Sequence, residues 1–130
     1  MELNFITDPE MAPRPREEIE ILELSLSAYP DRRRVKMSIR ITPFAPMDRP
    51  NLEIVVTNEQ GVFVGDISVI GAMQTRLNLT MHLREADIDG IYTFNASLSY
   101  DDEPAQHTTS AQIDLSQDAP ETAELPDSVE

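Results

Sequence analysis

The chain has no cysteine and no tryptophan, and it has only four glycines among its 130 residues. Without cysteine, a disulfide framework, a thiolate metal site and a cysteine nucleophile are all excluded. The four glycines are scattered, so no glycine-rich loop is available to bind phosphate groups. The sequence also lacks a secretory signal and any apolar run approaching about 18 residues. These absences lead us to expect a soluble, cytoplasmic protein. The alternative is a mature secreted protein, which would share the same features.

Positive charge is scarce as well, with 10 Lys and Arg against 24 Asp and Glu and a net charge of −14. Such a chain repels nucleic acid and anionic membranes, so we expect neither as a partner. Residues 116–130 hold five acids and no base, and we expect them to form a disordered acidic tail. Residues 1–16 contain three prolines and are expected to form a flexible leader. The single folded domain then spans residues 17–115.

Alternation of apolar and polar residues dominates this domain. From Tyr92 to Tyr100 every second residue is apolar and the others are small and polar, which is typical of a half-buried strand. In residues 17–28 the alternation slips by one residue after Ile21, and such a slip predicts a β-bulge. With strands also expected at residues 34–41, 52–57, 62–70, 76–83 and 109–115, the sequence predicts a seven-stranded antiparallel Greek-key β-sandwich.

A short motif at the start of the sixth expected strand points to a fold family. Gly90-Ile91-Tyr92 resembles the tyrosine corner of immunoglobulin-like sandwiches. The resemblance implies that the Tyr92 hydroxyl bonds to upstream backbone. It also implies an immunoglobulin-like fold, closer to fibronectin type III domains than to antibody domains, because Phe94 stands where the antibody disulfide cysteine is expected. The fold alone does not determine function.

One acidic stretch has the spacing of the first half of an EF-hand calcium loop. Its possible ligands are Glu85, Asp87 and Asp89, followed by Gly90. The twelfth position, which needs a bidentate Glu, is Ala96, and no helix flanks the stretch. These acids are therefore weak candidates for a metal site. The sequence favours the alternative, a solvated acidic turn that pairs with Arg32 and Arg33, and no cofactor is expected.

No catalytic constellation is recognisable. His82 and His107 lie near no nucleophile motif and are expected at the surface or rim of the fold. The second acidic run, residues 101–103, is separated from the first by one strand of about nine residues, or about 30 Å. Paired-carboxylate catalysis needs about 5 to 10 Å between the two groups. We therefore predict that the chain is not an enzyme.

Three expected loops, residues 42–51, 71–74 and 101–104, would share one end of the sandwich. They carry Phe44, Met47 and Met73 beside three acids, and exposed apolar groups rimmed by charge are typical of recognition sites. The favoured alternative for Phe44 is that it folds inward and caps the core.

A second candidate surface is the basic stripe of Arg34, Lys36 and Arg40. Its favoured alternative is that the stripe offsets neighbouring acidic strands or receives the acidic tail.

From these observations, the sequence predicts a non-enzymatic protein–protein interaction module that binds another chain, or itself, through end loops or an edge strand. The alternative is a ligand-binding module for calcium or carbohydrate. Carbohydrate is disfavoured because Trp is absent and Tyr92 and Tyr100 are expected in the core.

Overall fold

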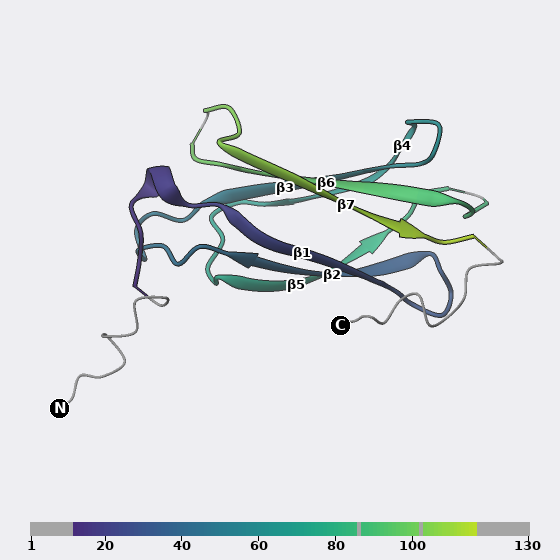
Figure 1. Ribbon diagram of the computed structural model, residues 1–130, viewed down its shortest axis with the longest axis horizontal. Helices are drawn as coiled ribbons and strands as arrows, with labels where there is room; N and C mark the ends of the chain where they lie inside the picture. The colour runs from purple at the N-terminus through teal and green to yellow at the C-terminus, as the bar shows by residue number, and fades with distance from the viewer. Residues whose placement is uncertain (1–11, 86, 102, 117–130) are drawn as a thin grey trace.

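The computed structural model describes residues 12–85, 87–101 and 103–116. They form seven strands in two antiparallel sheets that pack face to face, preceded by a short 3-10 helix, η2 (Figure 1). A three-stranded sheet has the order β1-β2-β5, and a four-stranded sheet has the order β4-β3-β6-β7. The predicted seven-stranded antiparallel sandwich is confirmed. The bounds are η2 Arg16–Glu18, β1 Ile21–Ala28, β2 Arg34–Ile41, β3 Asn51–Thr57, β4 Phe63–Val69, β5 Arg76–His82, β6 Ile91–Ser99 and β7 His107–Asp114.

The core lies between the central strands of the two sheets. The inward residues of β2 and β6 are buried because each of these strands has a hydrogen-bonded neighbour on both sides and a facing sheet above its apolar side. Each large aliphatic side chain or Phe among them contributes about 1.5 to 3 kcal/mol through removal from water. The inward residues of the two strands are Val35, Met37, Ile39 and Ile41 on β2, and Tyr92, Phe94, Ala96 and Leu98 on β6.

The β-bulge predicted in the first strand is present. The pairing of β1 with β2 shifts between Ile21 and Glu23, so Ile21 is buried while Leu22 is exposed. Beyond the shift, Leu24 and Leu26 pack against the core. The slip in the sequence therefore corresponds to an extra residue in the ladder.

A second bulge, in β4, was not predicted. The pairing of β3 with β4 shifts between Val56 and Thr57, which places Val64 in the core and leaves Phe63 exposed. The alternation in residues 62–70 places Phe63 in phase with Ile67 and Val69 and so predicts that all three face the core, which is wrong for Phe63. One extra residue reverses the side-chain phase of everything that precedes it.

The loops gather at two ends of the sandwich, which are defined here and used below. The loop end consists of residues 42–50, 70–75 and the described part of 100–106. The corner end consists of residues 29–33, 58–62 and the described part of 83–90 (Figure 1). Backbone hydrogen bonds from Ala72 N–H to the Pro50 carbonyl (2.8 Å) and from Leu83 N–H to the Arg33 carbonyl (2.9 Å) tie neighbouring loops together at each end. The three loops predicted to share one end do so.

Two polar residues near the start of β7 hold the start of β1. The Gln106 side-chain amide donates to the carbonyls of Arg16 (3.0 Å) and Ile19 (2.9 Å). The Ile21 N–H donates to Nδ1 of His107 at 3.1 Å. Because β1 and β7 are the edge strands on the same side of the two sheets, these bonds connect the sheets there.

Most of the expected leader and tail falls outside the described residues. Within the leader, Arg14 bridges to Phe44, and its N–H donates to the Pro43 carbonyl at 2.9 Å. Among the described residues, none forms a helix long and apolar enough to cross a membrane.

Candidate functional site

The Tyr92 hydroxyl is the centre of a hydrogen-bond network at the corner end. The residue is only 1% exposed, and its hydroxyl accepts from the Asp89 N–H (3.1 Å) and donates to Oε1 of Glu85 (2.5 Å). The bond to upstream backbone that the tyrosine-corner resemblance implies is thus present. Burial, assisted by the Glu85 carboxylate, raises the pKa of Tyr92 to about 12. Tyr92 is therefore a neutral structural phenol.

The Glu85 carboxylate joins two loops of the corner end. Its second oxygen, Oε2, accepts from the side-chain amide of Asn58 at 2.9 Å. Asn58 is itself buried, and its Oδ1 accepts the N–H groups of Gln60 and Val62, both at 2.9 Å. Glu85 therefore links β6, through Tyr92, to the turn between β3 and β4.

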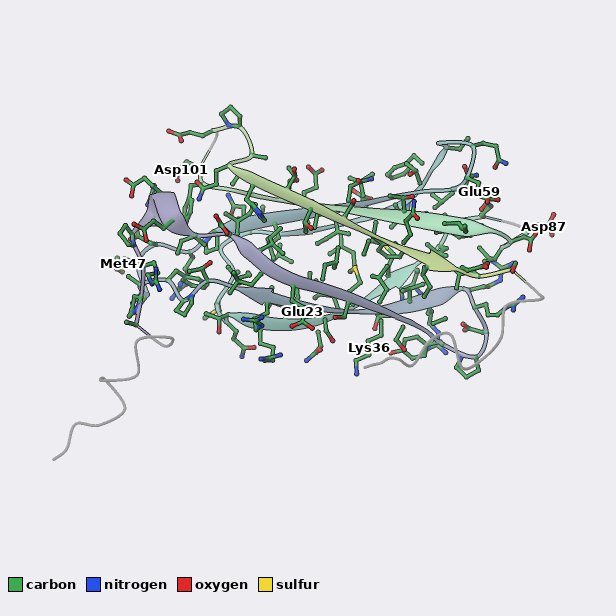
Figure 2. The ribbon with its side chains drawn as sticks, viewed as in Figure 1. Glu23, Lys36, Met47, Glu59, Asp87 and Asp101 are labelled. Carbon is green, nitrogen blue, oxygen red and sulfur yellow. The ribbon has the colours of Figure 1, made fainter. Side chains whose placement is uncertain are left out.

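The three weak metal candidates have different surroundings. Glu85 is half-buried in the network just described, whereas Asp87 and Asp89 are exposed, and Figure 2 shows Asp87 at the tip of the corner end. Within the described residues, no three His, Asp or Glu side chains come together in a metal-binding arrangement. The structure thus assigns Glu85 a role in holding the loop.

The arginines expected to pair with these acids make contacts with main-chain oxygens. Arg33 donates to the Glu85 carbonyl at 2.8 Å, and Nη1 of Arg32 donates to the Ser116 carbonyl at 2.7 Å. These hydrogen bonds connect the turn between β1 and β2 to the loop before β6 and to the end of β7.

The candidate interaction residues divide into one half-buried and two exposed side chains. Phe44 is half-buried and packs against the core, as the favoured alternative for it anticipates. Met47 and Met73 are 89% and 73% exposed. Figure 2 shows Met47 at the outer limit of the loop end.

A third exposed apolar residue, Ile70, belongs to the same end and is 80% exposed. The sequence does not predict Ile70 as an interaction residue, because the alternation makes it the last residue of the strand expected at residues 62–70. The outward direction of Ile70 can nevertheless be inferred from the alternation of this strand. Ile67 and Val69 face the core, so Ile70 has the opposite phase and must face outward.

Charged groups lie at the same end of the sandwich as these apolar side chains. The Arg16 guanidinium lies 3.1 Å from carboxylate oxygens of both Asp48 and Asp101, and it stacks over the Tyr100 ring at 4.6 Å. The Asp48 hydrogen bond raises the pKa of Arg16 above its ordinary value. Asp101 lies at the loop end while Asp87 lies at the corner end (Figure 2), so the two acidic runs are separated as predicted.

Both histidines have positions consistent with surface or rim residues. His82 is exposed on β5 opposite Arg34. His107 is half-buried, and its Nδ1 accepts the Ile21 N–H. The sequence signal for this bond is limited to the inward phase of His107, because its partner lies 86 positions away.

No protein-family model matches the chain, and no curated protein matches it. Solved structures do match. A β-glucuronidase of Bifidobacterium dentium superposes with a TM-score of 0.58 at 10% identity, over 75% of this chain and 18% of that chain. A β-glucuronidase of Parabacteroides merdae gives a TM-score of 0.58 at 13% identity, over 75% of this chain and 14% of that one. This chain therefore spans less than a fifth of those enzymes. At such identities the likeness shows the fold alone.

Proposed function

We propose that this chain is a non-enzymatic protein–protein interaction module of immunoglobulin-like fold that binds a partner protein through its loop end. The observation that carries the proposal is the exposure of Met47, Ile70 and Met73, between 73% and 89%, at one end of the sandwich. Exposed apolar groups bordered by charge are typical of recognition sites. In a complex, full burial of each such side chain would contribute about 1.5 to 3 kcal/mol.

The backbone that carries these side chains is held in place. The Gly71 N–H donates to Oδ1 of Asn51 (2.8 Å), and the Asp48 N–H donates to the Ala45 carbonyl (2.9 Å). The Tyr100 hydroxyl donates to the Asp48 carbonyl at 2.8 Å. A loop that is ordered before binding does not lose that conformational freedom on association, and this supports a binding role.

The non-enzymatic part of the proposal rests on two observations. The acidic runs lie at opposite ends of the sandwich (Figure 2), whereas hydrolysis of a glycosidic bond by paired carboxylates needs about 5 to 10 Å between them. The likeness to β-glucuronidases also covers only 14% to 18% of those two chains.

The closer kinship to fibronectin type III domains than to antibody domains is part of the same proposal. Its support is that β4 pairs with β3. In the constant-type immunoglobulin sandwich the fourth strand instead joins the sheet of the fifth.

The experiment is a pull-down from the native lysate with the tagged chain, followed by a solution mass measurement of the purified complex. The test variant is Met47→Ser/Ile70→Ser/Met73→Ser. The matched control is Val62→Ser, because Val62 is 55% exposed but lies at the corner end. We expect the triple variant to lose the partner and the control to retain it, with both melting within a few degrees of the parent.

Retention of the partner by the triple variant, or equal loss in the control, would refute the proposed binding surface. A chain that captures nothing and remains monomeric would refute the proposed function itself. Phe44→Ala is a separate stability control. Because Phe44 packs against the core, its truncation should lower the melting temperature.

A further inference from the structure

The outer faces of the two sheets carry opposite charge. The outer face of the three-stranded sheet carries four cations, three on β2 and one on β5, which we call the basic face: Arg34, Lys36, Arg40 and Arg76. The four strands of the other sheet contain no Lys or Arg, and their outward positions include Glu53, Asp66 and Asp114. In a chain of net charge −14, a concentration of cations on one face is unexpected.

Carboxylates within the described residues neutralise only part of the basic face. Asp31 pairs with Arg34 at 2.9 Å, and Glu23 pairs with Arg40 at 3.3 Å. Lys36 and Arg76 form no ion pair with any other described residue. Lys36 is exposed, and Figure 2 shows it on the outer side of the sheet. The face therefore retains uncompensated positive charge.

The described chain ends beside the turn that leads into this face, at residues 29–33. Nη1 of Arg32, two residues before Arg34, donates to the carbonyl of Ser116 at 2.7 Å. The other terminal nitrogen, Nη2, is buried and has no hydrogen-bond partner in the described part of the chain. Buried N–H groups nearly always donate a hydrogen bond. We therefore expect a further acceptor for this nitrogen near the point where the chain leaves β7.

The sequence that follows Ser116 supplies acceptors in a regular pattern. Residues 117–130 contain no base, and an acid occurs at every third position: Asp118, Glu121, Glu124, Asp127 and Glu130. In a chain that reaches at most about 3.3 to 3.6 Å per residue, this spacing allows neighbouring acids to contact cations up to about 10 Å apart.

We propose that the acidic segment 117–130 docks along the basic face of its own sandwich, starting at Arg32 and continuing past Lys36 towards Arg76. The length is sufficient. From Arg34 to Arg40 the strand extends about 20 Å, at about 3.3 Å per residue. Because a chain can reach about 3.3 to 3.6 Å per residue, seven residues are enough to cover that distance. Asp118, Glu121 and Glu124 thereby come within reach of the uncompensated cations. The interaction is weak for each pair and sensitive to salt, but tethering to β7 provides a high effective concentration.

This docking adds a second, electrostatic element to the interaction module, independent of the apolar loop end. It covers the basic face against other acidic partners, and a competing polyanion or high salt releases it. The proposal does not depend on whether the loop end binds a protein.

The test uses the only lysine of the chain, Lys36. A carbodiimide forms a zero-length amide between an amine and a carboxylate only where the two are in contact. Applied to the full chain at low salt, it should join Lys36 to Asp118, Glu121 or Glu124 in the monomer fraction, as mapped by peptide mass spectrometry. High salt should reduce the yield several-fold. Lys36→Arg, which preserves the charge, should abolish this product and serves as the control.

A second measurement keeps the proposal testable if the coupling chemistry is inefficient. In the variant Asp118→Asn/Glu121→Gln/Glu124→Gln/Asp127→Asn/Glu130→Gln, amide resonances of β2 and β5 should shift relative to the parent. Those of β3 and β6 in the other sheet should not shift.

Coupling of Lys36 to the segment only in dimers would assign the basic face to a second copy and overturn the intramolecular proposal. Coupling of Lys36 only to residues outside 117–130, or resonance shifts without preference for β2 and β5, would overturn docking altogether.

Discussion

The replacement Tyr92→Phe removes a single hydroxyl from a side chain that is 1% exposed, and it leaves the ring packing unchanged. Two hydrogen bonds disappear, the one accepted from the Asp89 N–H at 3.1 Å and the one donated to the Glu85 carboxylate at 2.5 Å. A neutral hydrogen bond contributes about 0.5 to 1.5 kcal/mol net, and one to a charged group contributes about 1.5 to 3 kcal/mol. Because Glu85 is only half-buried, water partly replaces the lost donor. We expect the free energy of unfolding to fall by about 2 to 3 kcal/mol.

The assay is equilibrium urea unfolding followed by far-ultraviolet circular dichroism, with the free energy obtained by linear extrapolation. Tyr100→Phe is the matched control. Tyr100 is also buried, but its hydroxyl donates only to the Asp48 backbone carbonyl, so the expected cost is about 1 kcal/mol. Equal costs for the two replacements would refute the reasoning. They would mean that the ring of Tyr92, and not its hydroxyl network, holds the corner end.

Four further predictions follow from the same structure. Because the pKa of Tyr92 is raised to about 12, the folded state keeps a proton that the unfolded state loses near its ordinary value of about 10. Stability should therefore fall as the pH rises from about 10 to 12, and the phenolate absorbance step at the higher pH should be missing in Tyr92→Phe. Gly65→Ala should destabilise by about 1 to 3 kcal/mol in urea unfolding, because its Cβ would lie 3.1 Å from the His82 carbonyl oxygen of β5. His107→Ala should cost about 1 to 3 kcal/mol and speed hydrogen exchange at the Ile21 amide, whereas His107→Asn, which retains an acceptor, should recover part of the loss. Millimolar calcium should leave the melting temperature unchanged relative to chelator, because the Glu85 carboxylate already accepts two hydrogen bonds, and a rise of several degrees would contradict that assignment.

The two bulges show where sequence reasoning succeeds and where it fails. In β1 the two adjacent apolar residues, Ile21 and Leu22, have a glutamate on each side, so the slip is visible as a change of apolar phase. In β4 the extra residue lies within Val62-Phe63-Val64, where every side chain is apolar. In a run without polar residues there is no apolar–polar alternation from which the direction of each side chain could be inferred. Only pairing with β3 could decide that Val64 faces inward and Phe63 outward.

The candidate site was also predicted only in part. The sequence places Met47 and Met73 in loops of one end, and the structure finds them there, exposed. The orientation of Phe44 could not be derived because a proline-rich loop has no side-chain period. Its packing against the core depends on the facing sheet.

The resemblance to immunoglobulin-like sandwiches implied the tyrosine corner. By itself, the sequence determined the strand count, the inward faces of β2 and β6 and the first bulge. All of these depend on neighbours within a few positions, where the two-residue period of a strand governs side-chain direction. The tertiary structure alone decided which strands share a sheet and which distant groups meet. Examples are the Ile21 amide with His107, 86 positions apart, and Arg32 with the Ser116 carbonyl, 84 positions apart. Such contacts arise when the sheets pack and edge strands meet, and no local pattern encodes them. The proposed docking depends on one of these contacts, because the bond from Arg32 holds Ser116, where the acidic segment starts, beside the turn that leads into the basic face.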